Sequence, residues 1–176
     1  MNLIPPTPEE YASNYEDYIK RATARGDVFK ALSIQIDEIK SVLGILSDEQ
    51  ALYRNGPQEW SIKEVIGHMV DVERIFSYRL LRISRNDATP LSGYDDPNYV
   101  REAQFDRYLS ADLISEFEYQ RRANILAVKN IPDESMLHRG TASGATVSAR
   151  ALIYILVGHV EHHMASLHEK YLPGLK

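Results

Sequence analysis

Apolar residues recur at intervals of three and four through most of this chain, which is the spacing of amphipathic helices. The clearest run follows Asp27 and carries one apolar stripe: Phe29, Leu32, Ile36, Ile39, Val42, Leu43 and Leu46. No segment shows the sustained two-residue alternation that is typical of a half-buried strand. The pattern therefore predicts an all-α fold.

Proline, glycine and capping residues mark where these helices begin and end. Thr7, Pro8 and Glu10 place a cap residue, a first-turn proline and a capping-box glutamate in order, so a short N-terminal helix is predicted that Gly26 ends. A second capping box opens at Ser61. The predicted helices cover residues 8–25, 27–46, 61–85, 111–130 and 147–171. Four long helices and one short helix favour a four-helix bundle with an N-terminal addition.

Two segments between the helices are predicted to be loops. Residues 86–99 are rich in Asp, Pro and Gly, and long loops of this kind often border binding sites. Residues 140–144 form the second loop. Arg79 and Arg82 precede the long loop and are interpreted as a solvated end of the bundle, with the binding of a substrate carboxylate as the alternative.

Composition limits the class of protein. The 176 residues are 44% hydrophobic and 26% charged, as in ordinary globular proteins, so we expect one domain over residues 1–176 in which residues 1–26 are an N-terminal extension. A net charge of −5 without basic runs argues against a nucleic-acid partner. The longest apolar stretch, residues 151–158, is too short for a bilayer span, and no secretory signal is recognisable. We therefore expect a cytoplasmic protein with no membrane partner.

The histidines of the last helix are the first candidate for a functional site. The chain has no cysteine, so any metal must be held by His, Asp or Glu. His159 and His163 stand four residues apart on a stripe of Leu and Ile, a spacing that puts both imidazoles on one face, one turn apart. His68 takes the equivalent position on the helix that begins at Ser61. The spacing predicts a metal site with these three ligands.

Two properties of this histidine set bear on its role. The alternative to metal binding is a set of hydrogen-bonded core histidines, but two unpaired buried imidazoles would each cost about 1–3 kcal/mol. Three histidines without a fourth protein ligand leave coordination positions open for water or substrate. Three imidazoles suit zinc, nickel, copper and iron alike, so the ligand set alone does not identify the ion.

Two carboxylates beside His68 are candidate catalytic residues. Glu64 lies four residues before His68 and Asp71 three residues after it, so either can orient a ligand or act as a base. The alternative for each is a solvated carboxylate at the helix edge. His162 and His168 lie off the stripe and are predicted to stay outside the ligand set.

Two motifs carry a family resemblance. Residues 60–71 read WSIKEVIGHMVD and residues 158–163 read GHVEHH, and together they resemble the DinB-like (YfiT-like) metalloprotein superfamily over roughly residues 29–171. The resemblance implies a bundle with up-down-down-up topology, a homodimer, and zinc or nickel held by His68, His159 and His163. It also implies relatives that are transferases and isomerases dependent on a low-molecular-weight thiol such as bacillithiol or mycothiol.

Three hypotheses for function follow. The leading one is a metal-dependent transferase that uses a low-molecular-weight thiol on a small-molecule substrate. The second is a metal-dependent hydrolase in which Glu64 or Asp71 is the base. The third is a non-catalytic metal-binding or stress-response module in which the metal stabilises the bundle.

Overall fold

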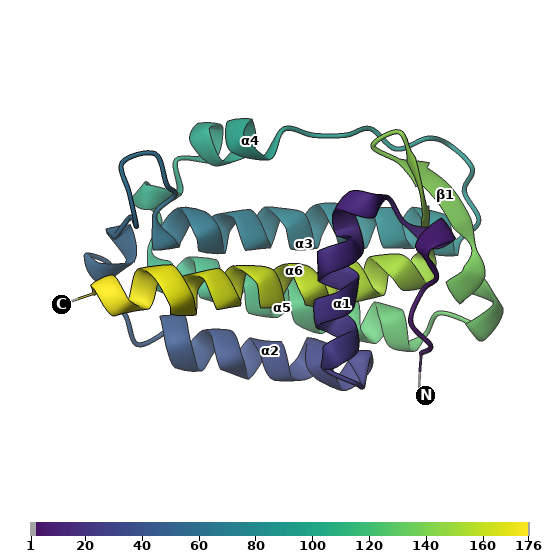
Figure 1. Cartoon of the computed structure of the whole chain (residues 1–176), viewed down its shortest axis with the longest axis horizontal. Coiled ribbons are helices and arrows are strands. Elements are labelled where there is room, and N and C mark those ends of the chain that lie inside the picture. Colours follow the sequence, from purple (N-terminus) through teal and green to yellow (C-terminus); the bar gives the residue numbers. More distant parts are fainter. Residues whose placement is uncertain (1–2, 176) are drawn as a thin grey trace.

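Four long helices pack side by side in the computed structural model, which describes residues 3–175 (Figure 1). They are α2 (Val28–Leu43), α3 (Ile62–Ser84), α5 (Ser110–Lys129) and α6 (Ala149–Ser166). Each of α2 and α3 packs against both α5 and α6, so the four form a bundle around a shared core. The mainly helical fold is confirmed. Within the described part of the chain, no helix has the length and apolar character needed to cross a bilayer.

Three of these helices begin with a side-chain cap, and capping residues of this kind can be recognised in a sequence. Asp27 accepts hydrogen bonds from the backbone N–H groups of Phe29 and Lys30 at the start of α2. At the start of α3, Ser61 and Glu64 form the predicted capping box. The caps satisfy N–H groups that have no partner inside the helix, which is why these boundaries were predictable.

The N-terminal segment differs from the single helix that was predicted over residues 8–25. It forms two 3₁₀ turns, Pro8–Glu10 and Ser13–Tyr15, before the α-helix α1 (Glu16–Ala24). The side chain of Glu10 is buried against Ser148 and Arg150, which fixes the first turn onto the start of α6. This tertiary contact, which the sequence pattern does not encode, separates the first turn from the helix.

Two short strands contradict the expectation of a chain without strands. They are β1 (Arg139–Ala142) and β2 (Ala145–Ser148), paired as an antiparallel hairpin. The hairpin turn is Ser143 and Gly144, with φ of 52° and 77°, and two consecutive positive φ values are typical of the tight type I′ turn. Four residues per strand are too few to show alternation, so residues 140–144 looked like a loop.

The predicted long loop also holds a helix. Residues 86–95 are irregular, but α4 (Asp96–Ala103) follows, capped by the side chain of Asp95 and with a proline in its first turn. The connection from α3 to α5 runs back along the bundle, and α4 lies within it (Figure 1). Leu91 exchanges backbone hydrogen bonds with Thr141 and Ser143, so the hairpin holds the first half of this connection against the bundle end.

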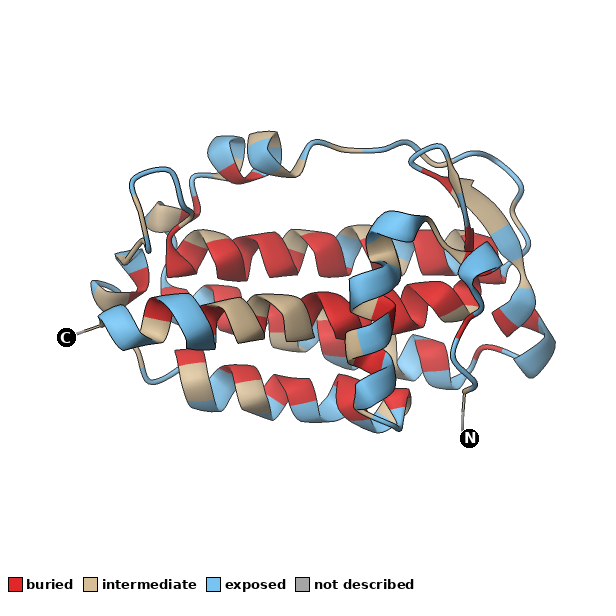
Figure 2. Ribbon diagram, viewed as in Figure 1, coloured by how far each residue is buried: buried red, intermediate tan, exposed pale blue. Residues whose placement is uncertain are grey.

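Helix α6 is buried on all sides over residues 151–160 (Figure 2). A helix of a four-helix bundle ordinarily keeps one solvated face. Here α1 crosses over that face, which accounts for the continuous apolar stretch in the sequence. The N-terminal extension therefore completes the core.

Gly158 is the point of closest approach between α1 and α6. A Cβ built at Gly158 would lie 1.9 Å from the backbone oxygen of Tyr18. We therefore expect Gly158→Ala to displace α1 and to lower the free energy of unfolding by about 1–3 kcal/mol. This loss is larger than the stabilisation that alanine provides through its higher helix propensity. Urea unfolding measures this change, with Gly56→Ala as the control, since a Cβ there meets only an ordinary contact. A Gly158→Ala protein at least as stable as the natural one would contradict this packing.

A buried ion pair lies at the centre of the bundle. Arg121 of α5 is fully buried and donates two hydrogen bonds of 2.8 Å to the carboxylate of Glu73 on α3. Its remaining donors reach Gln35 of α2 at 2.7 Å and the backbone oxygen of Leu156 on α6 at 3.2 Å. One side chain therefore joins all four helices.

Candidate metal centre

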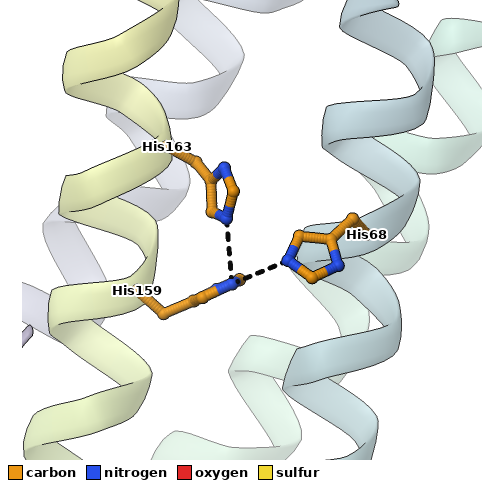
Figure 3. Close-up of side chains that lie close together, drawn as sticks. All are labelled: His68, His159 and His163. Carbon is orange, nitrogen blue, oxygen red and sulfur yellow. Dashed lines mark hydrogen bonds between the residues drawn. The ribbon is translucent and has the colours of Figure 1, made fainter. Parts of the chain in front are cut away.

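Three histidine side chains from two helices converge on one point of the bundle (Figure 3). The Nε2 atom of His159 lies 3.0 Å from Nε2 of His68 and 3.0 Å from Nε2 of His163. His68 comes from α3, whereas the other two occupy successive turns of α6. The structure therefore brings together the three residues that the sequence spacing singled out.

Burial fixes the charge state of this cluster. His68 and His159 are buried and His163 is partly buried. Burial lowers the pKa of His68 to about 4, and it holds the pKa values of His159 and His163 well below the usual range, with the neighbouring imidazoles adding to the shift. At neutral pH all three rings are uncharged, which is the state in which imidazole binds a metal.

The donor set fits a divalent transition metal. Three neutral imidazoles that turn their Nε2 atoms toward one another place nitrogen lone pairs around a single point, provided that Nδ1 carries the proton. With metal–nitrogen bonds of about 2.0–2.1 Å, tetrahedral coordination separates two nitrogen ligands by about 3.3 Å. The two separations of 3.0 Å are close to that value. Three nitrogen ligands leave at least one position for another molecule.

Asp96, the first residue of α4, faces the other ring nitrogen of His68. Its Oδ1 lies 3.6 Å from Nδ1 of His68, and it is buried without a hydrogen-bond partner among the described residues. Burial raises the pKa of Asp96. A carboxylate in this position favours the tautomer with the proton on Nδ1 and the lone pair on Nε2. Sequence reasoning missed this role because it depends on α4 folding back over α3.

A cavity of about 150 Å³ adjoins His68 and His159. Most of its other lining residues are aromatic (Tyr15, Tyr18, Phe76 and Tyr94) or polar (Asn14 and Asp96), and Val72 adds an aliphatic side chain. The ring of Tyr18 stands edge-on to the ring of His159, with 5.6 Å between the ring centres. The ring centres of Trp60 and His68 are 4.9 Å apart. The predicted N-terminal extension therefore forms part of the wall of this site, which its position in the sequence did not indicate.

The two candidate catalytic carboxylates point elsewhere. Glu64 accepts hydrogen bonds from the backbone of Ser61 and from Arg54, so it serves as the helix cap and in an ion pair. Asp71 is partly buried and lies 3.8 Å from Arg74, and burial raises its pKa. Among the described residues, neither lines the cavity beside the histidines.

Other residues that the sequence analysis weighed are placed as follows. His162 stays outside the cluster of three, with Nδ1 3.5 Å from Asp17. Arg82 is partly exposed and pairs with Asp87. The interpretation of Arg79 as a solvated end is wrong, because residues 86–95 and the hairpin cover this end of α3 and leave Arg79 only 2% exposed.

The depressed histidine pKa values predict an acid-sensitive metal-free protein. Below pH 6.5 the unfolded chain takes up protons that folded His68 binds only near pH 4, so stability falls as pH falls through this window. Each imidazole contributes a loss of about 1.4 kcal/mol per pH unit. Urea unfolding of metal-free protein at about pH 7 and about pH 5 measures the loss, and His68→Ala is expected to reduce it. Equal pH dependence in both proteins would contradict the assignment.

Comparisons with known proteins agree with this fold. A family model described as the DinB superfamily matches residues 31–167. The chain resembles the structure of YfiT from Bacillus subtilis, described as a probable metal-dependent hydrolase with an unusual four-helix bundle topology, with a TM-score of 0.76 and 14% identity over 93% of this chain and 90% of that one. It also resembles the mycothiol-dependent maleylpyruvate isomerase, with a TM-score of 0.63 and 15% identity over 78% of this chain and 58% of that enzyme.

At these identities the two structures show a shared fold. No curated protein sequence matches the chain. The chain spans less than two thirds of the length of the isomerase. The family model, by contrast, covers more than half of this chain and includes all three histidines of the cluster. The protein therefore belongs to the DinB superfamily.

Proposed function

We propose that this protein is a metal-dependent enzyme that transfers a low-molecular-weight thiol to a small electrophilic substrate. The observation that carries the proposal is the convergence of three neutral imidazoles beside a cavity. His68, His159 and His163 would hold a divalent metal, with zinc or nickel as the expected ion. When bound there, such a metal lowers the pKa of a coordinated thiol and so supplies a thiolate nucleophile.

The remaining residues of the site position and shield the reacting groups. Asp96, whose Oδ1 lies 3.6 Å from Nδ1 of His68, would favour through its charge the tautomer that directs Nε2 at the ion. Tyr18 packs on His159 and, together with Tyr94, narrows the cavity to a volume that admits only part of a small molecule.

The positions of Glu64 and Asp71 argue against hydrolysis with either of them as the base, and so support thiol transfer. Hydrolysis at a metal ordinarily requires a nearby general base, and Glu64 is already bound by Arg54 while Asp71 lies outside the cavity wall. A thiol that loses its proton on binding needs no such base. The similar maleylpyruvate isomerase is described as dependent on mycothiol, which also supports a thiol-dependent reaction.

Hydrolysis is the second candidate, because Asp96 has a buried, unpartnered carboxylate oxygen in the cavity wall. In that case Asp96 would take a proton from the attacking water. The description of YfiT as a probable metal-dependent hydrolase supports this candidate. The third hypothesis, a non-catalytic metal-binding module, predicts stabilisation by metal without turnover of any substrate.

Thiol dependence separates these functions. Metal-loaded protein is incubated with bacillithiol, mycothiol or glutathione and a chlorinated or epoxide acceptor, and the conjugate is measured by mass spectrometry. We expect a conjugate that disappears in His68→Ala. Turnover of ester or amide substrates without added thiol would establish the hydrolase instead, and no turnover in either panel would leave the non-catalytic module.

Helix order and assembly belong to the same proposal. An up-down-down-up order of the four bundle helices is supported by the long connection between α3 and α5, which returns along the bundle (Figure 1). We also propose a cytoplasmic homodimer that acts on a small molecule rather than on nucleic acid. The chain's net charge of −5 supports the last point.

A further inference from the structure

Arg79 is a buried cation without an acidic partner. It is 2% exposed, and no carboxylate oxygen of the described residues lies within 4.0 Å of its guanidinium. A buried charge that lacks a counter-ion is costly. Arg121, equally buried, has its charge matched by Glu73. Arg79 favours the charged form of Asp96 from a distance but forms no ion pair with it, so the guanidinium is left without a counter-ion in direct contact. The contrast between these two arginines indicates that Arg79 can take a partner from outside this chain.

The contacts of Arg79 are all with neutral groups. Its Nη2 atom donates to the backbone oxygen of Ser92 at 3.1 Å and to Oγ of Ser143 at 2.8 Å. The guanidinium carbon also lies 5.0 Å from the ring centre of Phe76 and 5.4 Å from that of Tyr94. These contacts fix the position of the guanidinium without neutralising it. The other guanidinium N–H groups have no acceptor among the hydrogen bonds of the described residues.

A cavity of about 330 Å³ adjoins this guanidinium. Arg79 and Arg82 supply its charged lining, and three tyrosines, Tyr78, Tyr94 and Tyr99, supply most of its aromatic surface. No acidic residue lines it among those described. Arg82 pairs with Asp87, so the cavity keeps the single unmatched positive charge of Arg79. In a chain of net charge −5, this local positive charge is not a general property of the surface.

We propose that this cavity binds the carboxylate of a small organic molecule through Arg79. A planar guanidinium matches the two oxygens of a carboxylate. One unmatched charge also suits a group that carries a single negative charge, as each carboxylate of a dicarboxylate does, better than a phosphate group with two charges. The serine contacts hold the guanidinium ready, so little side-chain entropy is lost on binding. Tyrosine rings offer both apolar surface and hydroxyl groups to the rest of the ligand.

The cavity lies beside the metal centre, and Tyr94 lines both. Arg79 follows His68 by eleven residues on the same helix, which corresponds to about 16 Å along the axis. A molecule with a carboxylate at Arg79 would extend past Tyr94 toward the histidines. This extension rests on the proposed function, whereas the carboxylate site itself does not.

The proposal is tested by titrating the full chain with succinate, with and without added metal. Thermal unfolding and calorimetry measure the binding. Inorganic phosphate at matched ionic strength is the comparison. We expect succinate to raise the melting temperature of the natural protein in a saturable way, and phosphate to have a clearly smaller effect. The response is expected in metal-free protein too, so failure of the metal proposal would not remove it.

Arg79→Met is the decisive variant. It should lose the succinate response while keeping or exceeding the melting temperature of the natural protein, because it removes an unmatched buried charge. Arg79→Lys keeps the charge but loses the planar donor pair, and should weaken succinate binding about tenfold. Arg79→Lys also tests the proposal if Arg79→Met does not fold. Arg74→Met, at an exposed arginine of the same helix, is the matched control and should bind succinate normally.

Three results would overturn the proposal. Equal binding of succinate to the natural protein and to Arg79→Met would place the site elsewhere. An absence of any saturable response in the natural protein would remove the site. Equal responses to phosphate and succinate, both lost in Arg79→Met, would show a general anion site and contradict the carboxylate assignment.

Discussion

His159→Ala is expected to abolish metal binding. His159 occupies the middle of the cluster, with its Nε2 atom 3.0 Å from those of both His68 and His163. Its loss leaves two imidazoles from different helices with no bridging ligand. Loss of a residue that only orients a ligand already weakens metal binding about 10–100-fold, so loss of this ligand should cost more than about 100-fold. Competition with a chromophoric chelator measures the affinity.

His162→Ala is the matched control for this prediction. His162 lies on the same helix three residues from His159, but its ring faces Asp17 and stands outside the cluster. We expect its removal to leave the metal affinity within a few-fold of the natural value. Loss of binding in His162→Ala, or its retention in His159→Ala, would place the metal elsewhere.

Glu73→Ala is expected to cause the largest loss of stability of any single change outside the metal centre. The substitution leaves Arg121 charged and fully buried with only Gln35 and one backbone oxygen as partners. Removal of one partner of a buried ion pair costs about 3–5 kcal/mol, because the remaining charge stays desolvated. Chemical denaturation gives the change in the free energy of unfolding.

Two variants separate this effect from simple loss of an ion pair. Glu116→Ala removes the partner of Arg74 in an exposed pair that also joins α3 to α5, and should cost less than about 1 kcal/mol. The double variant Glu73→Leu with Arg121→Met removes both charges and should recover most of the lost stability. A cost in Glu73→Ala no larger than in Glu116→Ala would contradict the burial of the pair.

Much of the fold was predictable because its signals are local. Hydrophobic periodicity and side-chain caps depend on residues within one turn, and they placed α2, α3, α5 and α6 within a few residues of their observed bounds. The hairpin and α4 were missed for opposite reasons. The strands are too short to show a period, whereas Asp95 and a following proline did mark the start of α4 within a segment interpreted as a loop.

The candidate metal centre was predictable only in part. His159 and His163 stand out because they interrupt an aliphatic stripe at a chelating interval, and His68 holds the matching position on another helix. Asp96 and Tyr18 could not be assigned in the same way. They reach the site because α4 and α1 fold back over the bundle, and these contacts between distant segments leave no periodic trace in the sequence.

The burial of Arg79 could not be predicted from the sequence either. A charged residue near a helix end is ordinarily solvated, which was the interpretation from sequence. The hairpin and the connection after α3 cover this end and bury the guanidinium. Only the tertiary structure distinguishes this arginine from the exposed Arg74 on the same helix.

Metal analysis combined with anomalous diffraction tests the central claim most directly. The protein is purified without an affinity tag, its metal content is measured, and crystals are examined at the absorption edge of the metal found. We predict one ion per chain, bonded to the Nε2 atoms of His68, His159 and His163 at about 2.0–2.2 Å, with at least one position free of protein ligands. Protein that takes up no metal, or an anomalous peak away from these histidines, would contradict the account.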